Sequence, residues 1–239
     1  MNTSQCICLL LFLACSLPAQ EVAKTAFWKK VFRATPAPEM PILAAKWVKE
    51  TAVSERATVT AGVVEAAVEI NPASATLVVG AISRAMPEMA AVAAAAAAAK
   101  QPAQADAICR AATTVAPAMA ANIVGAMCKA VPEMYRSVAV AASESATGAG
   151  KEILRSIASA QPALRPRVDQ EIARYDRGLP PVASVLDRVR MAQTNVPGTG
   201  PGQMARPVAL DSAVSANSND GHPKNGDNGW HGGRNYAKP

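Results

Sequence analysis

Large side chains are scarce in this sequence: Phe, Trp and Tyr make up only 4% of its 239 residues, although 50% of the residues are hydrophobic. Much of the hydrophobic share is alanine, which has little apolar area to bury. The hydrophobic driving force scales with buried apolar area, at about 25 cal/mol per Å², so a few large anchors cannot hold this chain together. Its core must instead combine many small contacts in which backbones approach closely.

Residues for acid–base, nucleophilic or metal chemistry are equally few. Both histidines, His222 and His231, lie near the C-terminus in a segment with nothing to hold them in place. A structural zinc site needs four ligands at defined spacings, and the scattered Cys and His residues do not provide them. The stretch GAGKE at 148–152 has neither the earlier glycine nor the following Ser or Thr of a phosphate-binding loop. We therefore expect a protein that is not an enzyme and that has no cofactor and no metal site.

Concentrated charge of one sign is missing too. The net charge is +6 and the pI is about 9.2, but acidic residues are mixed among the basic ones. A nucleic-acid-binding surface requires clustered Lys and Arg. We expect no nucleic acid partner and only a weak attraction to anionic surfaces.

The N-terminus resembles an export signal. Its first twenty residues, MNTSQCICLLLFLACSLPAQ, carry no charge and contain an apolar run from Cys6 to Leu17. This run is shorter than the roughly 20 residues of a membrane-spanning helix, and it suits a signal peptide at 1–19 with cleavage after Ala19. We predict export to the periplasm or the extracellular space. A buried N-terminal helix is the alternative, since no Lys or Arg stands near the start, and a lipoprotein carrying its lipid on Cys15 matches less well.

Prolines recur at a fixed spacing. The first four gaps are fifteen residues and the last is thirty: Pro72, Pro87, Pro102, Pro117, Pro132 and Pro162. Inside a helix each proline would cost about 3 kcal/mol or more, whereas the first position of a helix tolerates it well. We predict that each proline starts a new helix of about eleven or twelve residues, followed by a tight turn.

The fifteen-residue unit has apolar columns. Numbered from the proline, place seven is occupied by Val63, Val78, Ala93, Ile108, Ile123, Val138, Ile153 and Val168, and place eleven by Ala67, Ile82, Ala97, Ala112, Met127, Ala142, Ile157 and Ile172. Both places lie on one helix face with place four, which is mostly small, while place thirteen is mostly polar. Short connections make neighbouring helices antiparallel. We predict an all-α, α-solenoid-like stack of about eight short helices over residues 41–192, in which each helix contacts mainly its sequence neighbours.

Two features within the repeat carry separate expectations. The run AAVAAAAAAAK, from Ala90 to Lys100, is an excellent helix former but specifies almost no packing, so we expect this helix to pack loosely or to fray. Cys109 and Cys128, the cysteines left after removal of the signal, differ in level by about 6 Å of helix rise. A disulfide would be strained, and we predict two free, buried thiols.

The segment 20–40 combines a basic aromatic helix with a proline-rich connector. Its stretch AFWKKVFR contains the candidate contact residues Phe27, Trp28, Lys29, Lys30, Phe32 and Arg33. A basic helix with aromatic anchors can lie in a membrane interface, but a terminal helix of a solenoid must also cap the first hydrophobic edge. We favour the cap.

The C-terminal part departs from the repeat. The stretch PALRPRVDQEIARYDRG, residues 162–178, is polar enough to cap the stack, and VASVLDRVRMAQ predicts one more helix. From residue 193 to 239 the chain is rich in Gly, Asn, Pro and Ser, which predicts a disordered tail.

These expectations define a function class. We predict an exported, non-catalytic helical-repeat protein that acts as a binding or scaffolding module of the cell envelope or periplasm, with an unidentified protein partner. The alternative is a protein whose amphipathic helices lie on a lipid surface. Such helices usually carry many Lys and Arg residues on their polar face, whereas the polar faces of these helices carry few.

Overall fold

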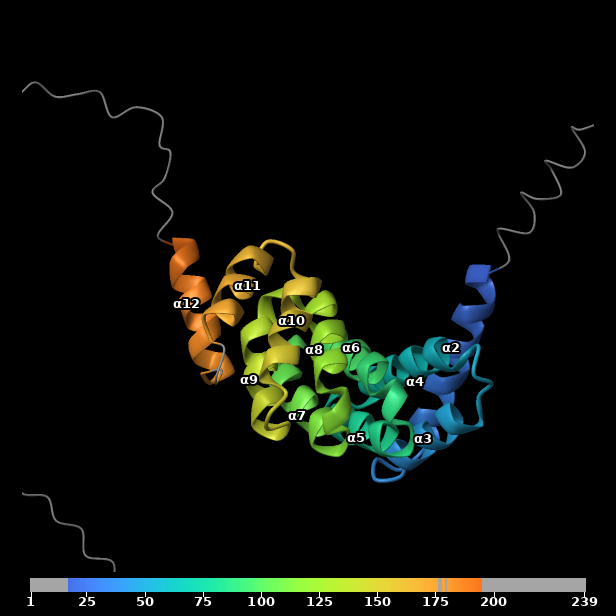
Figure 1. Cartoon of the computed structure of the whole chain (residues 1–239). Coiled ribbons are helices and arrows are strands. Elements are labelled where there is room, and N and C mark those ends of the chain that lie inside the picture. Colours follow the sequence, from blue (N-terminus) through green and yellow to red (C-terminus); the bar gives the residue numbers. More distant parts are fainter. Residues whose placement is uncertain (1–16, 176–177, 179, 195–239) are drawn as a thin grey trace, which may run out of the picture. The chain divides into compact units, whose positions relative to one another are not determined.

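The computed structural model describes residues 17–175, 178 and 180–194, and these residues form helices joined by short turns, with no strand among them (Figure 1). Residues 195–239 of the predicted tail and the first sixteen residues of the predicted signal lie outside this range, whereas Gln193 and Thr194, at the start of the predicted tail, belong to α12. The α-helices are α2 (Leu17–Ala34), α3 (Met40–Glu50), α4 (Arg56–Ile70), α5 (Ala75–Ala85), α6 (Ala90–Lys100), α7 (Ala105–Val115), α8 (Ala120–Ala130), α9 (Tyr135–Ser145), α10 (Gly150–Ala160), α11 (Arg165–Arg174) and α12 (Val182–Thr194).

The periodic prolines start new helices, as predicted. Five of them begin a three-residue 3₁₀ turn, and an α-helix of eleven residues follows each turn directly: Pro72–Ser74, Pro87–Met89, Pro102–Gln104, Pro117–Met119 and Pro132–Met134. The residue before each of these prolines lies outside the α region, with φ between −127° and −144° and ψ between 63° and 92°, because the proline ring disfavours the α conformation there. In the turn before α6, for example, the Met86 N–H donates to the Ile82 carbonyl at 2.8 Å, and the Met86 carbonyl accepts from the Met89 N–H at 2.9 Å. Neither hydrogen bond uses an N–H of residue 87, so the missing N–H of the proline costs this turn no hydrogen bond.

The α9–α10 turn has no proline and uses another residue. Between α9 and α10, where Thr147 occupies the proline place, Gly148 takes a φ of 96°. This left-handed conformation is open to glycine at no steric cost. The fifteen-residue period therefore continues, although this unit has no proline.

The helices form two layers, which we call the even layer (α2, α4, α6, α8 and α10) and the odd layer (α3, α5, α7 and α9). The most extensive packing joins helices two apart in the chain, within one layer. The prediction that each helix contacts mainly its sequence neighbour is therefore wrong. Because the chain reverses at each turn, alternate helices run the same way and meet along their flanks, whereas consecutive helices meet across the layers.

The core lies between the two layers and follows the predicted columns. All eight residues at place seven are fully buried, and place eleven is buried from Ala67 to Ile157, while Ile172 is partly buried. Place eight is buried as well, for example at Val79 and Val124. One continuous hydrophobic cluster thus runs through the repeat.

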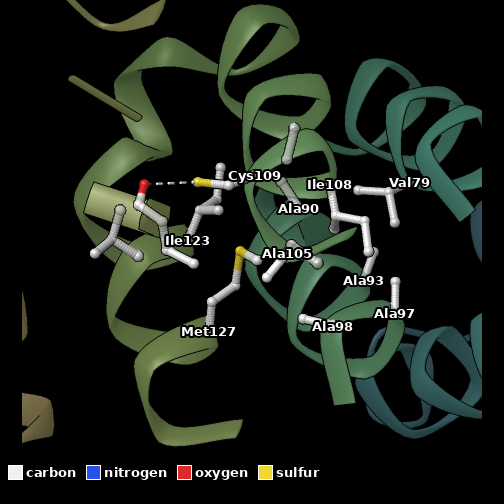
Figure 2. Packing of buried hydrophobic residues seen from close by; sticks show 14 of the residues in the cluster. Val79, Ala90, Ala93, Ala97, Ala98, Ala105, Ile108, Cys109, Ile123 and Met127 are labelled. Carbon is white, nitrogen blue, oxygen red and sulfur yellow. Dashed lines mark hydrogen bonds between the residues drawn. The ribbon is translucent and has the colours of Figure 1, made fainter. Parts of the chain in front are cut away.

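The alanine-rich helix is better packed than expected. α6 is helical from Ala90 to Lys100, and six of its alanines are buried. Figure 2 shows side chains of the neighbouring helices, including Val79, Ile108 and Met127, gathered around the small residues of α6. The larger side chains that α6 lacks are supplied by the helices around it, so the expectation of a loose helix is wrong.

The C-terminal end changes the pattern. α11 packs on α10, but α12 packs on α9 and so continues the odd layer in place of α11. Arg136 of α9 makes a bidentate ion pair with Asp187 of α12, with N–O distances of 2.7 and 2.8 Å. Glu171 of α11 is 7% exposed and accepts hydrogen bonds from Arg174 and Arg188. Val185, Leu186 and Val189 of α12 are buried in the hydrophobic cluster, and the polar contacts add to this attachment of the final helices.

Candidate functional site

The aromatic residues predicted for the N-terminal contact surface divide into two groups. Trp28 and Phe32 are buried, and the Phe32 ring lies 5.3 Å from the ring of Trp47 in α3. Trp28 lies over Gly62 of α4, where the absence of a side chain leaves room for the indole. Phe27 remains 58% exposed, although its ring is within 6.2 Å of Trp47. Two of the three aromatic side chains therefore cover the first edge of the stack.

The basic residues of this segment also differ from one another. Lys29 pairs with Glu69 of α4 at 2.5 Å, and Lys100 of α6 holds the same carboxylate at 2.9 Å. Hydrogen bonds from these two lysines lower the pKa of Glu69 below its ordinary value. Lys30 and Arg33 are exposed. Lys29 thus joins α2 to the even layer, and Lys30 and Arg33 remain open to solvent.

A groove that no sequence feature had indicated crosses the outer face of the odd layer. It has a volume of about 780 Å³ and is lined mainly by α5 and α7, with the start of α3 beside them. We call it the α5–α7 groove. Its hydrophobic lining includes Ile42, Leu77, Gly80, Ala81, Ala107 and Ala111.

The lining combines a floor of small residues with large exposed hydrophobic side chains. Ile42 is 71% exposed and Leu77 is 62% exposed, and both are among the few large hydrophobic residues that face solvent in the described part of the chain. A hollow of 300–1,000 Å³ with apolar walls is typical of a binding site. Isolated exposed hydrophobics are ordinary on a protein surface, but these two line the same hollow.

Charged residues stand along the groove at defined places. Arg84 lies in the last turn of α5 and is exposed, and within the described residues it makes no ion pair. Arg110 lies midway along α7 and pairs with Glu144 of α9 at 2.8 Å. Asp106 lies in the first turn of α7, where a negative charge favours the helix dipole. The end of the groove at the helix C-termini is therefore basic, and the opposite end carries one acid.

The buried columns of the repeat do not indicate the groove. On α5 and α7 it is lined mainly by places five, six, nine, ten and thirteen, which do not belong to those columns. A signal for it does exist in the sequence: Leu77 is large at place six, where the units of α7 and α9 have Ala107 and Ser137. Gly80, in the middle of the same helix, is a second signal.

A second hollow, of about 690 Å³, lies between the α9–α10 turn and the start of α12. Lys151 of the GAGKE stretch lines it together with Glu144 and Tyr175. Glu144 is already paired with Arg110. The stretch forms a turn and the start of α10, and no strand precedes it among the described residues.

The two cysteines are free and buried, as predicted. The Cys109 thiol donates to the Val138 carbonyl at 3.4 Å. Burial raises the pKa of both Cys109 and Cys128 to about 12. Since the thiolate is the reactive form, both residues act as small hydrophobic side chains of the core.

The described residues offer neither a metal-binding cluster nor a membrane-spanning helix. No group of three or more His, Cys, Asp and Glu residues there is placed to hold a metal ion. None of the helices described is both long and apolar enough to cross a bilayer.

Comparison of the chain with protein-family models, with curated proteins and with solved structures gave no match.

Proposed function

We propose that this chain is an exported, non-catalytic helical-repeat protein that binds a partner protein through the α5–α7 groove, as a binding or scaffolding module of the cell envelope or periplasm. The observation that carries the proposal is the placing of Ile42 and Leu77, both largely exposed, on the walls of one hollow of about 780 Å³. Exposed apolar area of this kind is stabilised when a partner covers it.

The architecture supports this use. Stacked repeats present a continuous outer face, and solenoids commonly bind their partners on such a face. The core does not depend on the groove residues, because the buried columns at places seven, eight and eleven point the other way. Places five, six, nine and ten of α5 and α7 line the groove and are thus open to binding. Export is supported by the uncharged apolar start of the sequence.

Site-specific photo-crosslinking would test the proposal. A photoreactive amino acid at position 77 is expected to give a discrete crosslinked product in the native host, and mass spectrometry would identify it. The control places the same amino acid at Val53, a loop residue that is 78% exposed and does not line the groove. The identified partner would then be purified, and its affinity is expected to fall for Leu77→Asp but not for Val53→Asp. Equal affinity for both variants contradicts the proposal.

A lipid-surface role is the second candidate, because Phe27 is 58% exposed and the neighbouring Lys30 is exposed too. The burial of Trp28 and Phe32 favours capping over lipid contact. Flotation with anionic vesicles distinguishes the two roles. If Phe27 is a lipid anchor, Phe27→Ser lowers the floating fraction, whereas a capping segment gives no flotation with either chain.

A further inference from the structure

Three glycines stand inside α-helices of the stack, and each needs a physical reason, because glycine is less favourable than alanine there. A Cβ at Gly62 would overlap the ring of Trp28, and a Cβ at Gly125 would lie 2.7 Å from the Ser156 hydroxyl. A Cβ at Gly80 would meet nothing within 4 Å. Contacts within the protein therefore explain the first two glycines and leave the third without an explanation.

Gly80 lines the α5–α7 groove. Glycine allows another backbone to approach a helix closely, and the neighbouring floor residues Ala81, Ala107 and Ala111 are also small. The same device operates inside the stack, where the Ser156 hydroxyl of α10 reaches the Ala121 carbonyl of α8 at 2.5 Å beside Gly125. A helix packed over Gly80 would approach α5 in the same manner.

The dimensions of the floor fit a helix. α5 and α7 each contain eleven residues, which corresponds to a length of about 16 Å at a rise of 1.5 Å per residue. Neighbouring helices with small residues at their contact pack toward the low end of an 8–10 Å axial separation. A partner helix of about three turns would cover the floor and bring its own apolar face against Ile42 and Leu77.

The charges select the partner further. Arg84 is exposed and makes no ion pair within the described residues, while Arg110 already has Glu144 as its partner. An acidic side chain near Arg84 would gain an ion pair, whereas one near Asp106, at the other end of the groove, would be repelled. Charge complementarity of this kind fixes orientation and excludes wrong partners.

We infer that the occupant of the α5–α7 groove is an amphipathic α-helix of a partner protein, with a carboxylate opposite Arg84. This inference rests on the proposed function. It assigns the closest contact to Gly80, the apolar contacts to Ile42 and Leu77, and the polarity of binding to Arg84 and Asp106.

Selection from a helical peptide library tests the inference on the full chain. A phage-displayed helix of 16–18 residues, randomised on one face, would be enriched on the protein, and the selected peptides would be synthesised for fluorescence-anisotropy titration. The expected peptides carry a Leu- or Ala-rich face and an Asp or Glu near one end. Arg84→Glu is expected to weaken their binding about tenfold, and replacing the peptide carboxylate by Lys is expected to restore it. Gly80→Leu is expected to abolish binding, and Val53→Asp to leave it unchanged.

The outcomes separate the inference from the proposed function. Peptides that lose binding on Leu77→Asp but ignore Arg84→Glu occupy the groove without the carboxylate, and this overturns the inference alone. Peptides insensitive to Leu77→Asp, or a library that yields no binder, count against the groove itself and therefore against both. Binding of the full chain to phosphatidylglycerol vesicles that is lost on Leu77→Asp makes the groove a lipid site and overturns the helix assignment. Circular dichroism of every variant excludes loss of folding as the cause.

Discussion

Replacing Gly62 and Gly80 separately by alanine changes the stability of the fold in opposite directions. Both residues lie inside α-helices, so each substitution removes the same unfavourable glycine. At Gly80 the new Cβ meets nothing within 4 Å. At Gly62 it overlaps Cζ3 of Trp28 and lies 3.1 and 3.2 Å from two further ring atoms. The pair of variants therefore isolates the cost of displacing the N-terminal cap.

The magnitudes follow from these geometries. Alanine is more favourable than glycine in a helix by about 0.8–1.0 kcal/mol, so Gly80→Ala is expected to raise the free energy of unfolding by about that amount. At Gly62 the same gain is opposed by overpacking, which costs about 1–3 kcal/mol in a filled core. Trp28 is only 9% exposed and has little room to move. Gly62→Ala is therefore expected to lower stability by about 1 kcal/mol, which leaves the two variants about 2 kcal/mol apart.

Thermal unfolding followed by circular dichroism provides the assay. A difference of this size corresponds to about 4–8 °C in Tm for a chain of this length. A double variant is the control: in a Trp28→Ala background the clash is absent, so Gly62→Ala should become stabilising by about 1 kcal/mol. Equal stabilisation by alanine at Gly62 and Gly80 in the otherwise unchanged chain would refute the assignment of Trp28 as the residue that requires Gly62.

Three further predictions concern charges and thiols. Lysine partners lower the pKa of Glu69. The contribution of Glu69 to the stability of the fold is therefore present above the ordinary pKa of 4.5 and is lost as the pH falls through the lower pKa of the folded state. Glu69→Gln should flatten the acid limb of a plot of Tm against pH. With a pKa of about 12, the thiols of Cys109 and Cys128 are ionised to about one part in ten thousand at pH 8. In a chain that lacks the other three cysteines, iodoacetamide should therefore modify these two thiols only after unfolding. Rapid labelling of the folded chain would contradict their burial. Arg136→Ala removes the bidentate pair with Asp187, and it should speed hydrogen exchange in α12 while leaving α6 unchanged; equal acceleration in both helices would show that the pair acts on the whole stack.

The repeat could be predicted from sequence because proline and the apolar columns act locally. A proline every fifteen residues constrains its own turn, and places seven and eleven report one face of one helix. Packing within a layer is not local in this sense. It depends on helices thirty residues apart, whose contact positions are small residues with no distinctive pattern. The position of α12 beside α9 likewise involves contacts between distant segments, such as the ion pair of Arg136 with Asp187, fifty-one residues away, and the burial of Val185 and Leu186 in the common core.

The alanine-rich helix shows why composition misled the packing prediction. Ala93 and Ala97 occupy the two core places of α6, so the sequence alone suggests that this helix contributes too little side-chain volume to pack well. In the structure they are fully buried, because Ile108 and Met127 from the next helices extend into the same cluster. A helix that contributes little volume can still be well packed when its neighbours contribute more, and only the three-dimensional arrangement shows which neighbours these are.

The groove follows from the same property that builds the core. A chain poor in large side chains must stack its helices through small residues, and small residues recur on the outward face as well as on the inward one. On the inner face other helices cover them, but at Gly80 and Ala107 no described helix does. If glycine at position 80 serves binding, Gly80→Ala should give a more stable protein that binds its partner more weakly. If the glycine has no role in binding, the same variant should be more stable and should bind the partner with unchanged affinity. Titration of Gly80→Ala with the selected peptides therefore decides between a functional glycine and an accidental one.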